Sequence, residues 1–203
     1  PMLTVHHLNN SRSQRVLWLL EELELPYEIV HYQRDPNTML APASLRAVHP
    51  LGKSPVVTTD EGLVLAESGA IIETVIERYG QGRLAPAPLT PEALRYRYWL
   101  HFAEGTAMSP LLLKLVFDRI ESSKMPFFAK PVAKAIAAKA KSAFILPNIA
   151  SHLNYMEAEL GKSEWFAGDA FSGADIQMSF VVEAAHARGG LDAKRPKLMD
   201  WLA

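Results

Sequence analysis

The sequence predicts a small mixed α/β domain followed by an all-helical domain. Stretches with the alternation of β-strands occur only in residues 1–83, residues 84–91 are rich in proline and lack any period, and residues 92–203 show helical spacing throughout. We therefore expect two domains, at residues 1–83 and 92–203, with a linker at residues 84–91.

The first segments predict a strand, a helix and a second strand. Residues 3–8 form a short apolar stretch, and the polar turn that follows is rich in residues that favour helix starts. Apolar side chains at helical spacing then continue from Val16 to Leu23, and Pro26 ends the pattern. Residues 27–32 alternate as a second strand.

The rest of the first domain predicts a weak helix, a hairpin and a final helix. The weak helix covers residues 43–48, the hairpin joins strands at 54–59 and 63–65, and Ser68 is placed to cap a helix that ends at Gly80. The resulting order is β-α-β-α-β-β-α. A right-handed crossover between the first two strands gives a mixed sheet with helices on its faces.

The second half predicts helices only. One local signal is sharp: Ser172 and Asp175 have the spacing of a capping box, and Phe171 and Ile176 are placed to pack across it. Pro147 is expected to start or kink a helix. The expected helices span residues 92–107, 110–122, 126–160, 174–188 and 197–202.

Composition excludes several classes of function. The 203 residues carry 21 Lys+Arg and 22 Asp+Glu, so no excess of positive charge favours a nucleic-acid partner. The longest apolar run, Val16–Leu20, is too short to cross a membrane, and the first residues do not resemble a secretory signal. We expect a cytoplasmic protein without membrane or nucleic-acid partners. The chain has no cysteine, so any thiol chemistry must use a thiol from another molecule.

Two further patterns have competing interpretations. His6 and His7 are neighbours on a strand and point to opposite faces, so they cannot share a metal, and we expect no metal site. Between Glu121 and Glu157 there are five lysines and no acid. This run either attracts anionic ligands or acidic partners or is an ordinary solvated helix face.

Four motifs in order carry a resemblance to a known family. They are Ser11–Arg15 at the start of the first helix, Gly52–Val56 before the hairpin, Glu67–Ser68 at the third helix, and the capping box at Ser172–Asp175. With the two-domain pattern, they resemble cytosolic glutathione S-transferases over essentially the whole chain, especially bacterial and fungal members with a catalytic serine. The resemblance implies a thioredoxin-like first domain, glutathione as co-substrate, and a homodimer.

Glutathione chemistry requires stabilisation of a thiolate. A thiol with a pKa near 8.5 is only about 3% ionised at pH 7, and lowering that pKa by about two units makes the thiolate the main form. Ser11 is the candidate, because its hydroxyl can donate a hydrogen bond to sulfur and the helix N-terminus adds positive potential. Ser13 competes for this role, and simple helix capping is the structural alternative for both. Arg12 can add charge, whereas Arg15 is expected to pair internally.

The resemblance also assigns the binding of the tripeptide's backbone. It implies a cis bond at Ser54–Pro55, with the Ser54 backbone pairing with the cysteinyl part of glutathione. Lys53 is expected to meet the glycine carboxylate, although it could be an ordinary solvated lysine. Glu67 and Ser68 are expected at the γ-glutamyl end, Glu67 on the amine and Ser68, with the helix N-terminus, on the carboxylate.

The second domain is expected to supply the electrophile pocket. The resemblance implies that an acidic residue of this domain, Glu104, reaches the partner subunit's glutathione. The predicted activity is attack of the thiolate on a hydrophobic electrophile or on a peroxide oxygen; isomerisation would use the same first site. The alternative is a non-catalytic member that binds glutathione, apolar ligands or proteins. Candidates for the apolar wall, most of which could be core instead, are Trp99, Phe102, Met108, Leu112, Leu115 and Phe117.

Overall fold

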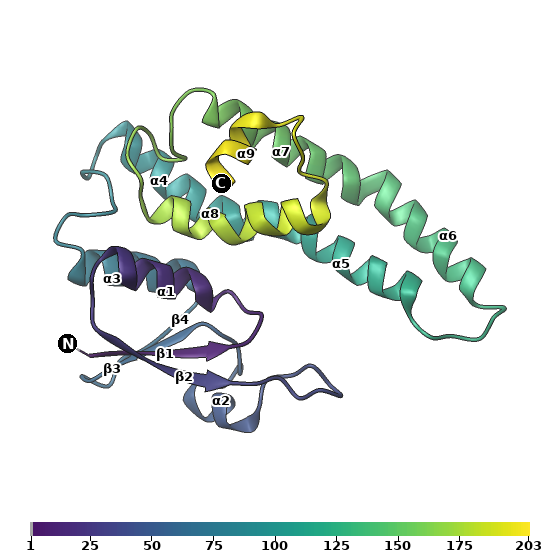
Figure 1. The fold of residues 1–203 in the computed structure, drawn as a ribbon, viewed down its shortest axis with the longest axis horizontal. Coiled ribbons are helices and arrows are strands. Elements are labelled where there is room, and N and C mark those ends of the chain that lie inside the picture. Colours follow the sequence, from purple (N-terminus) through teal and green to yellow (C-terminus); the bar gives the residue numbers. More distant parts are fainter. Residues whose placement is uncertain (1) are drawn as a thin grey trace.

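The computed structural model describes residues 2–203 and contains a four-stranded mixed sheet followed by a helical domain (Figure 1). The strand order is β2-β1-β3-β4, with β1 parallel to β2, and β3 antiparallel to both β1 and β4. This confirms the predicted α/β class and element order. The first-domain elements are β1 (Leu3–Leu8), α1 (Ser13–Glu22), β2 (Tyr27–Tyr32), α2 (Ala43–Val48), β3 (Val56–Thr59), β4 (Val64–Ala66) and α3 (Ser68–Tyr79).

The central strand β1 organises the first domain. Its Leu3 and Val5 are fully buried, and they pack with apolar side chains of α1 and α3, which lie together on one face of the sheet, while α2 lies on the other face (Figure 1). Strand β3 begins at Val56, two residues later than expected. Pro55 cannot donate to the ladder because it has no amide hydrogen, so regular pairing starts after it.

The second domain is helical, as predicted, but its first two expected helices are continuous with each other. The expected break before Pro110 does not occur: a π-helical turn at Ala103–Ala107 leads directly into α5, with Pro110 in the first turn of that helix. A second π-helical turn, Lys141–Ile145, joins α6 to α7, and Pro147 starts α7 as expected. The helices are α4 (Pro91–Phe102), α5 (Met108–Ser122), α6 (Lys130–Ala140), α7 (Leu146–Leu160), α8 (Gly173–Ala184) and α9 (Pro196–Leu202).

Helix α8 is the central helix of the second domain and joins it to the first. Its capping box is present: Asp175 accepts from the Ser172 amide at 3.0 Å. Gly173 packs so closely against α3 that a Cβ there would lie 2.6 Å from Ile76 Cδ1. Ile176, one turn into the helix, is buried in the core of the first domain. The two domains therefore share packed surface around this helix, and across residues 2–203 no helix combines the length and apolarity needed to cross a bilayer.

Candidate functional site

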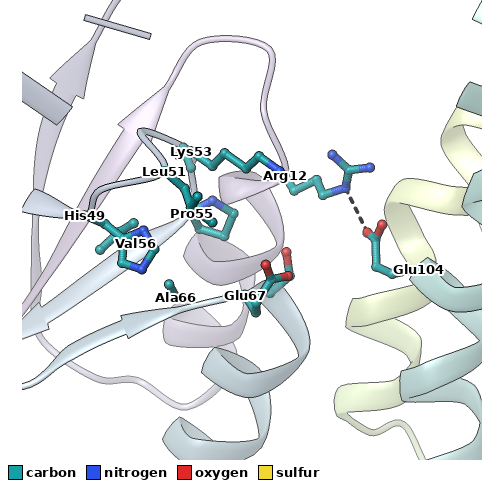
Figure 2. A pocket seen from close by; sticks show the side chains of 11 residues that line it. Arg12, His49, Leu51, Lys53, Pro55, Val56, Ala66, Glu67 and Glu104 are labelled. Carbon is teal, nitrogen blue, oxygen red and sulfur yellow. Dashed lines mark hydrogen bonds and ion pairs between the residues drawn. The ribbon is translucent and has the colours of Figure 1, made fainter. Parts of the chain in front are cut away.

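A polar cavity of about 200 Å³ lies where the first domain faces the helical domain (Figure 2). Figure 2 shows Lys53 and Arg12 on one side of the opening and Glu67 on the other. All six residues expected to hold glutathione line this cavity, whereas Ser11 lies beside it. The lining residues are Arg12, His49, Leu51, Lys53, Ser54, Pro55, Val56, Ala66, Glu67, Ser68 and Glu104.

The segment before β3 is fastened to β1 by one side chain. Ser54 Oγ donates to the His6 carbonyl at 2.8 Å and accepts from the Leu8 amide at 3.2 Å. The Ser54–Pro55 peptide bond is cis, as predicted. Lys53, immediately before this segment, is exposed and free to extend along the cavity.

The start of α3 forms another wall of the cavity. Glu67 has φ of 71°, in the left-handed region, which costs a non-glycine residue about 1–2 kcal/mol. This conformation makes Glu67 the N-cap residue and Ser68 the first residue of the helix. The prediction that Ser68 caps α3 was therefore wrong by one position, because the chain turns at Glu67. Ser68 is buried, and the first amides of α3, which have no acceptor within the helix, belong to a turn that borders the cavity through Glu67 and Ser68.

Three hydroxyls and one imidazole form a hydrogen-bonded chain behind the cavity. His7 Nδ1 lies 2.6 Å from Ser13 Oγ, Ser13 Oγ lies 2.8 Å from Ser11 Oγ, and Ser11 Oγ donates to Ser54 Oγ at 3.2 Å. Ser13 is fully buried, whereas Ser11 is half-buried at the rim. Both serines thus belong to a network that extends well beyond a helix cap. Arg12 occupies the N-cap position of α1 without a side-chain capping bond.

His7 is the functional candidate that sequence reasoning missed. Its sequence signal, two neighbouring histidines on a strand, bears only on a shared metal, although His7 lies near the end of the strand that leads into the serine turn. Burial lowers the pKa of His7, and the neighbouring His31 lowers it further through charge repulsion. The side chains of His6 and His7 do point to opposite faces, since His6 instead bonds with Tyr32 and Thr58.

A charged cluster links α1 to the helical domain at the other end of the cavity. Arg15, which is 1% exposed, donates to Glu104 at 2.7 Å and to Gln177 at 3.2 Å, and Arg12 also donates to Glu104 at 2.8 Å. Both guanidinium carbons lie 5.1 Å from the centre of the Phe180 ring. Internal pairing of Arg15 is confirmed. Within its own chain the Glu104 carboxylate binds both arginines, and its expected contact with the partner subunit's glutathione stays a prediction.

Burial and ion pairing oppose each other in this cluster. Burial lowers the pKa of Arg15 to about 10, and the charge and hydrogen bond of Glu104 oppose that effect. For Glu104, burial is the largest single influence and raises the pKa, but Arg15 and Arg12 together lower it below its usual value. The Glu104 carboxylate is therefore ionised across the neutral range, which keeps the two domains electrostatically joined beside the cavity.

The expected apolar wall is only partly available. Trp99, Phe102 and Met108 are buried in the core of the helical domain, so for these three candidates the core alternative holds. Their helical spacing reflects packing against the other helices of the domain. Leu112 is exposed on α5, and Leu115 and Phe117 are partly exposed on the same helix.

Both domains of the chain are similar to known proteins. Family models for the N-terminal and C-terminal domains of glutathione S-transferases match residues 11–78 and 133–203. Glutathione S-transferase 1 of Saccharomyces cerevisiae is 34% identical over 209 residues, which cover 100% of this chain and 89% of the yeast protein. The chain belongs to the glutathione S-transferase family.

Solved structures agree with this membership. This glutathione S-transferase chain is similar to the crystal structure of a glutathione S-transferase from Actinobacillus pleuropneumoniae, with 30% identity, a TM-score of 0.73, and coverage of 99% of this chain and 85% of that one. It shares its fold with a sphingomonad glutathione S-transferase complexed with glutathione, at 23% identity, a TM-score of 0.72, and coverage of 98% and 90%.

Proposed function

We propose that this protein is a glutathione transferase whose bound tripeptide lies in the cavity of Figure 2 with its sulfur at Ser11. One observation carries the proposal: a lysine, a carboxylate and an open helix N-terminus surround one small cavity whose edge bears a hydroxyl. Glutathione has two carboxylates, an ammonium and a thiol, so this set matches each of its polar groups. A scaffold protein would need no such combination.

The binding assignments follow from charge and position. Lys53 pairs with the glycine carboxylate, and Glu67, across the cavity, holds the α-ammonium group. The γ-glutamyl carboxylate lies at the N-terminus of α3, where Ser68 and the first amides can donate to it. The Ser54 backbone is left to pair with the cysteinyl residue like an added strand.

Exposure favours Ser11 over Ser13 as the residue that holds the thiolate. Ser13 is fully buried and already bonded to His7, whereas Ser11 is half-buried beside the cavity. A hydrogen bond to a charged group contributes about 1.5–3 kcal/mol, which corresponds to about 1–2 pKa units of the thiol. Starting near 8.5, the thiol then ionises substantially at neutral pH. Arg12, with its charge partly neutralised by Glu104, adds a smaller attraction.

The test is the pKa of bound glutathione together with its conjugation to chlorodinitrobenzene. We expect Ser11→Ala to raise the thiol pKa by about 1–2 units and to lower the rate at pH 7 by about tenfold or more. Ser13→Ala is the matched control, with a smaller effect. An unchanged thiol titration in Ser11→Ala would remove Ser11 from the role. Binding of glutathione without turnover on any electrophile would favour the non-catalytic alternative.

The second substrate is a hydrophobic electrophile that enters between the serine turn and the helical domain. Leu112, Leu115 and Phe117 are the remaining apolar candidates on α5 for its contact surface. The same thiolate can attack a peroxide oxygen, so reduction of an organic hydroperoxide is the second assay. Such chemistry fits detoxification in the cytoplasm.

A homodimer is part of the proposal. The outer face of α4 exposes Leu94 and Tyr98, which are 69% and 46% exposed, beside an apolar hollow that Phe102 and Gly105 also line. Burying this face against a second copy would remove it from water. Light scattering of the wild type and of Leu94→Glu tests this, with a monomeric mass expected for the variant.

A further inference from the structure

The outer ends of α5 and α6 form a helical hairpin that extends beyond the rest of the molecule (Figure 1). No residue from 112 to 136 is buried, although the hairpin carries many apolar side chains. At its turn, Phe127 and Phe128 are 88% and 69% exposed, and their rings meet edge to face with centroids 5.7 Å apart. Two adjacent, exposed phenylalanines at the tip of a projection have no role in the fold.

The charge around this tip has a single sign. Asp118 and Glu121, the two acids on the last turns of α5, are both paired with Lys141, and Asp118 also with Lys114. Within residues 2–203, no ion pair involves the remaining lysines of the hairpin. These are the exposed residues Lys124, Lys130, Lys134 and Lys139. The tip therefore combines apolar aromatic surface with uncompensated positive charge.

We propose that this tip, residues 124–139, docks on the surface of an anionic phospholipid membrane. Phe127 and Phe128 insert at the boundary between head groups and acyl chains, and the four lysines contact the anionic head groups. Phenylalanine flanked by lysine is the combination by which amphipathic helical segments bind an interface without crossing it. The net charge of −1 for the whole chain conceals this local charge, which is why composition gave no expectation of a membrane partner.

Charge distinguishes a membrane from the other obvious occupant, a second copy of the chain. A symmetric contact between two identical tips would place the lysines of one copy against those of the other. An anionic bilayer instead attracts each lysine, by about fivefold in affinity per residue near the surface. The proposal is independent of the transferase chemistry, because the tip contains none of the cavity residues.

Co-sedimentation with lipid vesicles tests the proposal on the full chain. Vesicles of phosphatidylcholine alone are compared with vesicles in which about one third of the lipid is phosphatidylserine. We expect binding to the anionic vesicles that weakens with added salt and little binding to the neutral ones. The variant Phe127→Ser/Phe128→Ser should lose about tenfold or more in affinity, and Lys124→Gln/Lys130→Gln a similar amount.

Matched controls separate the tip from general surface effects. Leu89→Ser removes another fully exposed apolar side chain, in the connector, and Lys194→Gln/Lys197→Gln removes two exposed lysines far along the chain; both should bind vesicles like the wild type. Conjugation activity of each variant shows that it is folded. Absence of vesicle binding by the wild type overturns the proposal, as does equal binding to both vesicle types. A loss of oligomer mass in the phenylalanine variant, without lipid binding, would assign the tip to contact between copies instead.

Discussion

His7 is expected to set the direction of the hydroxyl chain that ends at Ser11. The proton of Ser54 is already used, because Ser54 donates to the His6 carbonyl. If His7 Nδ1 carries a hydrogen, it donates to Ser13, Ser13 donates to Ser11, and the Ser11 hydrogen, which donates to Ser54 Oγ at 3.2 Å, can turn from Ser54 to the sulfur of glutathione when the tripeptide binds. If His7 Nδ1 accepts instead, Ser13 donates to His7, and Ser13 Oγ becomes a second acceptor that competes with the sulfur for the Ser11 hydrogen.

The substitutions His7→Asn and His7→Asp separate these two states. Asparagine can present an N–H near the position of Nδ1, whereas an ionised aspartate can only accept. His7→Asp therefore draws the Ser13 hydrogen away from Ser11 and removes most of a charge-assisted hydrogen bond, about 1.5–3 kcal/mol. We expect the pKa of bound glutathione to rise by about 1–2 units in His7→Asp and to stay within about half a unit of wild type in His7→Asn.

The assay is a pH titration of thiolate absorbance with glutathione bound, with conjugation rates measured beside it. The negative charge of aspartate also repels a thiolate, so His31→Asp is the control, because His31 is exposed and contacts the His7 ring without bonding to Ser13. Equal thiol pKa values in His7→Asp and wild type would refute the reasoning. So would a rise in His7→Asn as large as that in His7→Asp.

Further predictions concern the contact between the domains and the capping box of α8. Glu104→Gln leaves Arg15 buried without an anion and should cost about 1–3 kcal/mol in urea unfolding, less than a fully buried pair because Glu104 is 33% exposed. Folding lowers the pKa of Glu104, so its carboxylate stabilises the fold above the usual carboxyl value of 4.5, and this stabilisation is lost as the pH falls through the folded value. The difference in free energy of unfolding between wild type and Glu104→Gln should therefore shrink between about pH 6 and about pH 3. A difference that stays constant over this range would contradict the reasoning. Gly173→Ala places a methyl group 2.6 and 2.9 Å from two isoleucine side chains of α3 and should cost about 1–3 kcal/mol, seen as a lower melting temperature. Asp175→Ala leaves three buried donors without an acceptor, namely the amides of Phe166 and Ser172 and the indole N–H of Trp201. It should lower the free energy of unfolding by about 3 kcal/mol or more, against about 1 kcal/mol for Ser172→Ala. If chemical denaturation gave the reverse order, this account of the cap would be wrong.

Local patterns predicted the elements of this fold well. The apolar stretch at residues 3–8, the alternation at residues 27–32 and the capping box at Ser172 depend only on neighbouring residues, and they coincide with β1, β2 and the start of α8. Continuity between helices was not predictable in the same way. Pro110 signals a break by itself, but the widened turn before it is held by packing against other helices.

The parts of the candidate site that lie in short sequence motifs were predictable, whereas the contacts between residues from different elements were not. Lys53, Glu67 and Ser68 lie in short motifs, and the cavity brings them together. The contact of Glu104 with Arg15 joins residues 89 positions apart, and that of His7 with Ser13 depends on how the chain turns after β1. Such contacts arise from tertiary packing, which periodicity and spacing do not encode.

The π-helical turn at Ala103–Ala107 determines how this segment would respond to the loss of one residue. Its closing bond runs from the Met108 amide to the Ala103 carbonyl, so this turn holds one more residue than an α-helical turn. Deleting Gly105 would let this turn wind as an ordinary α-helix, and α4 and α5 would keep nearly their present orientation about the helix axis, because the π-helical turn already accommodates one extra residue. The change would fall on Glu104, whose place in the widened turn presents its carboxylate to two guanidinium groups, so this deletion is expected to break the ion pairs with Arg12 and Arg15 while α4 and α5 stay in place.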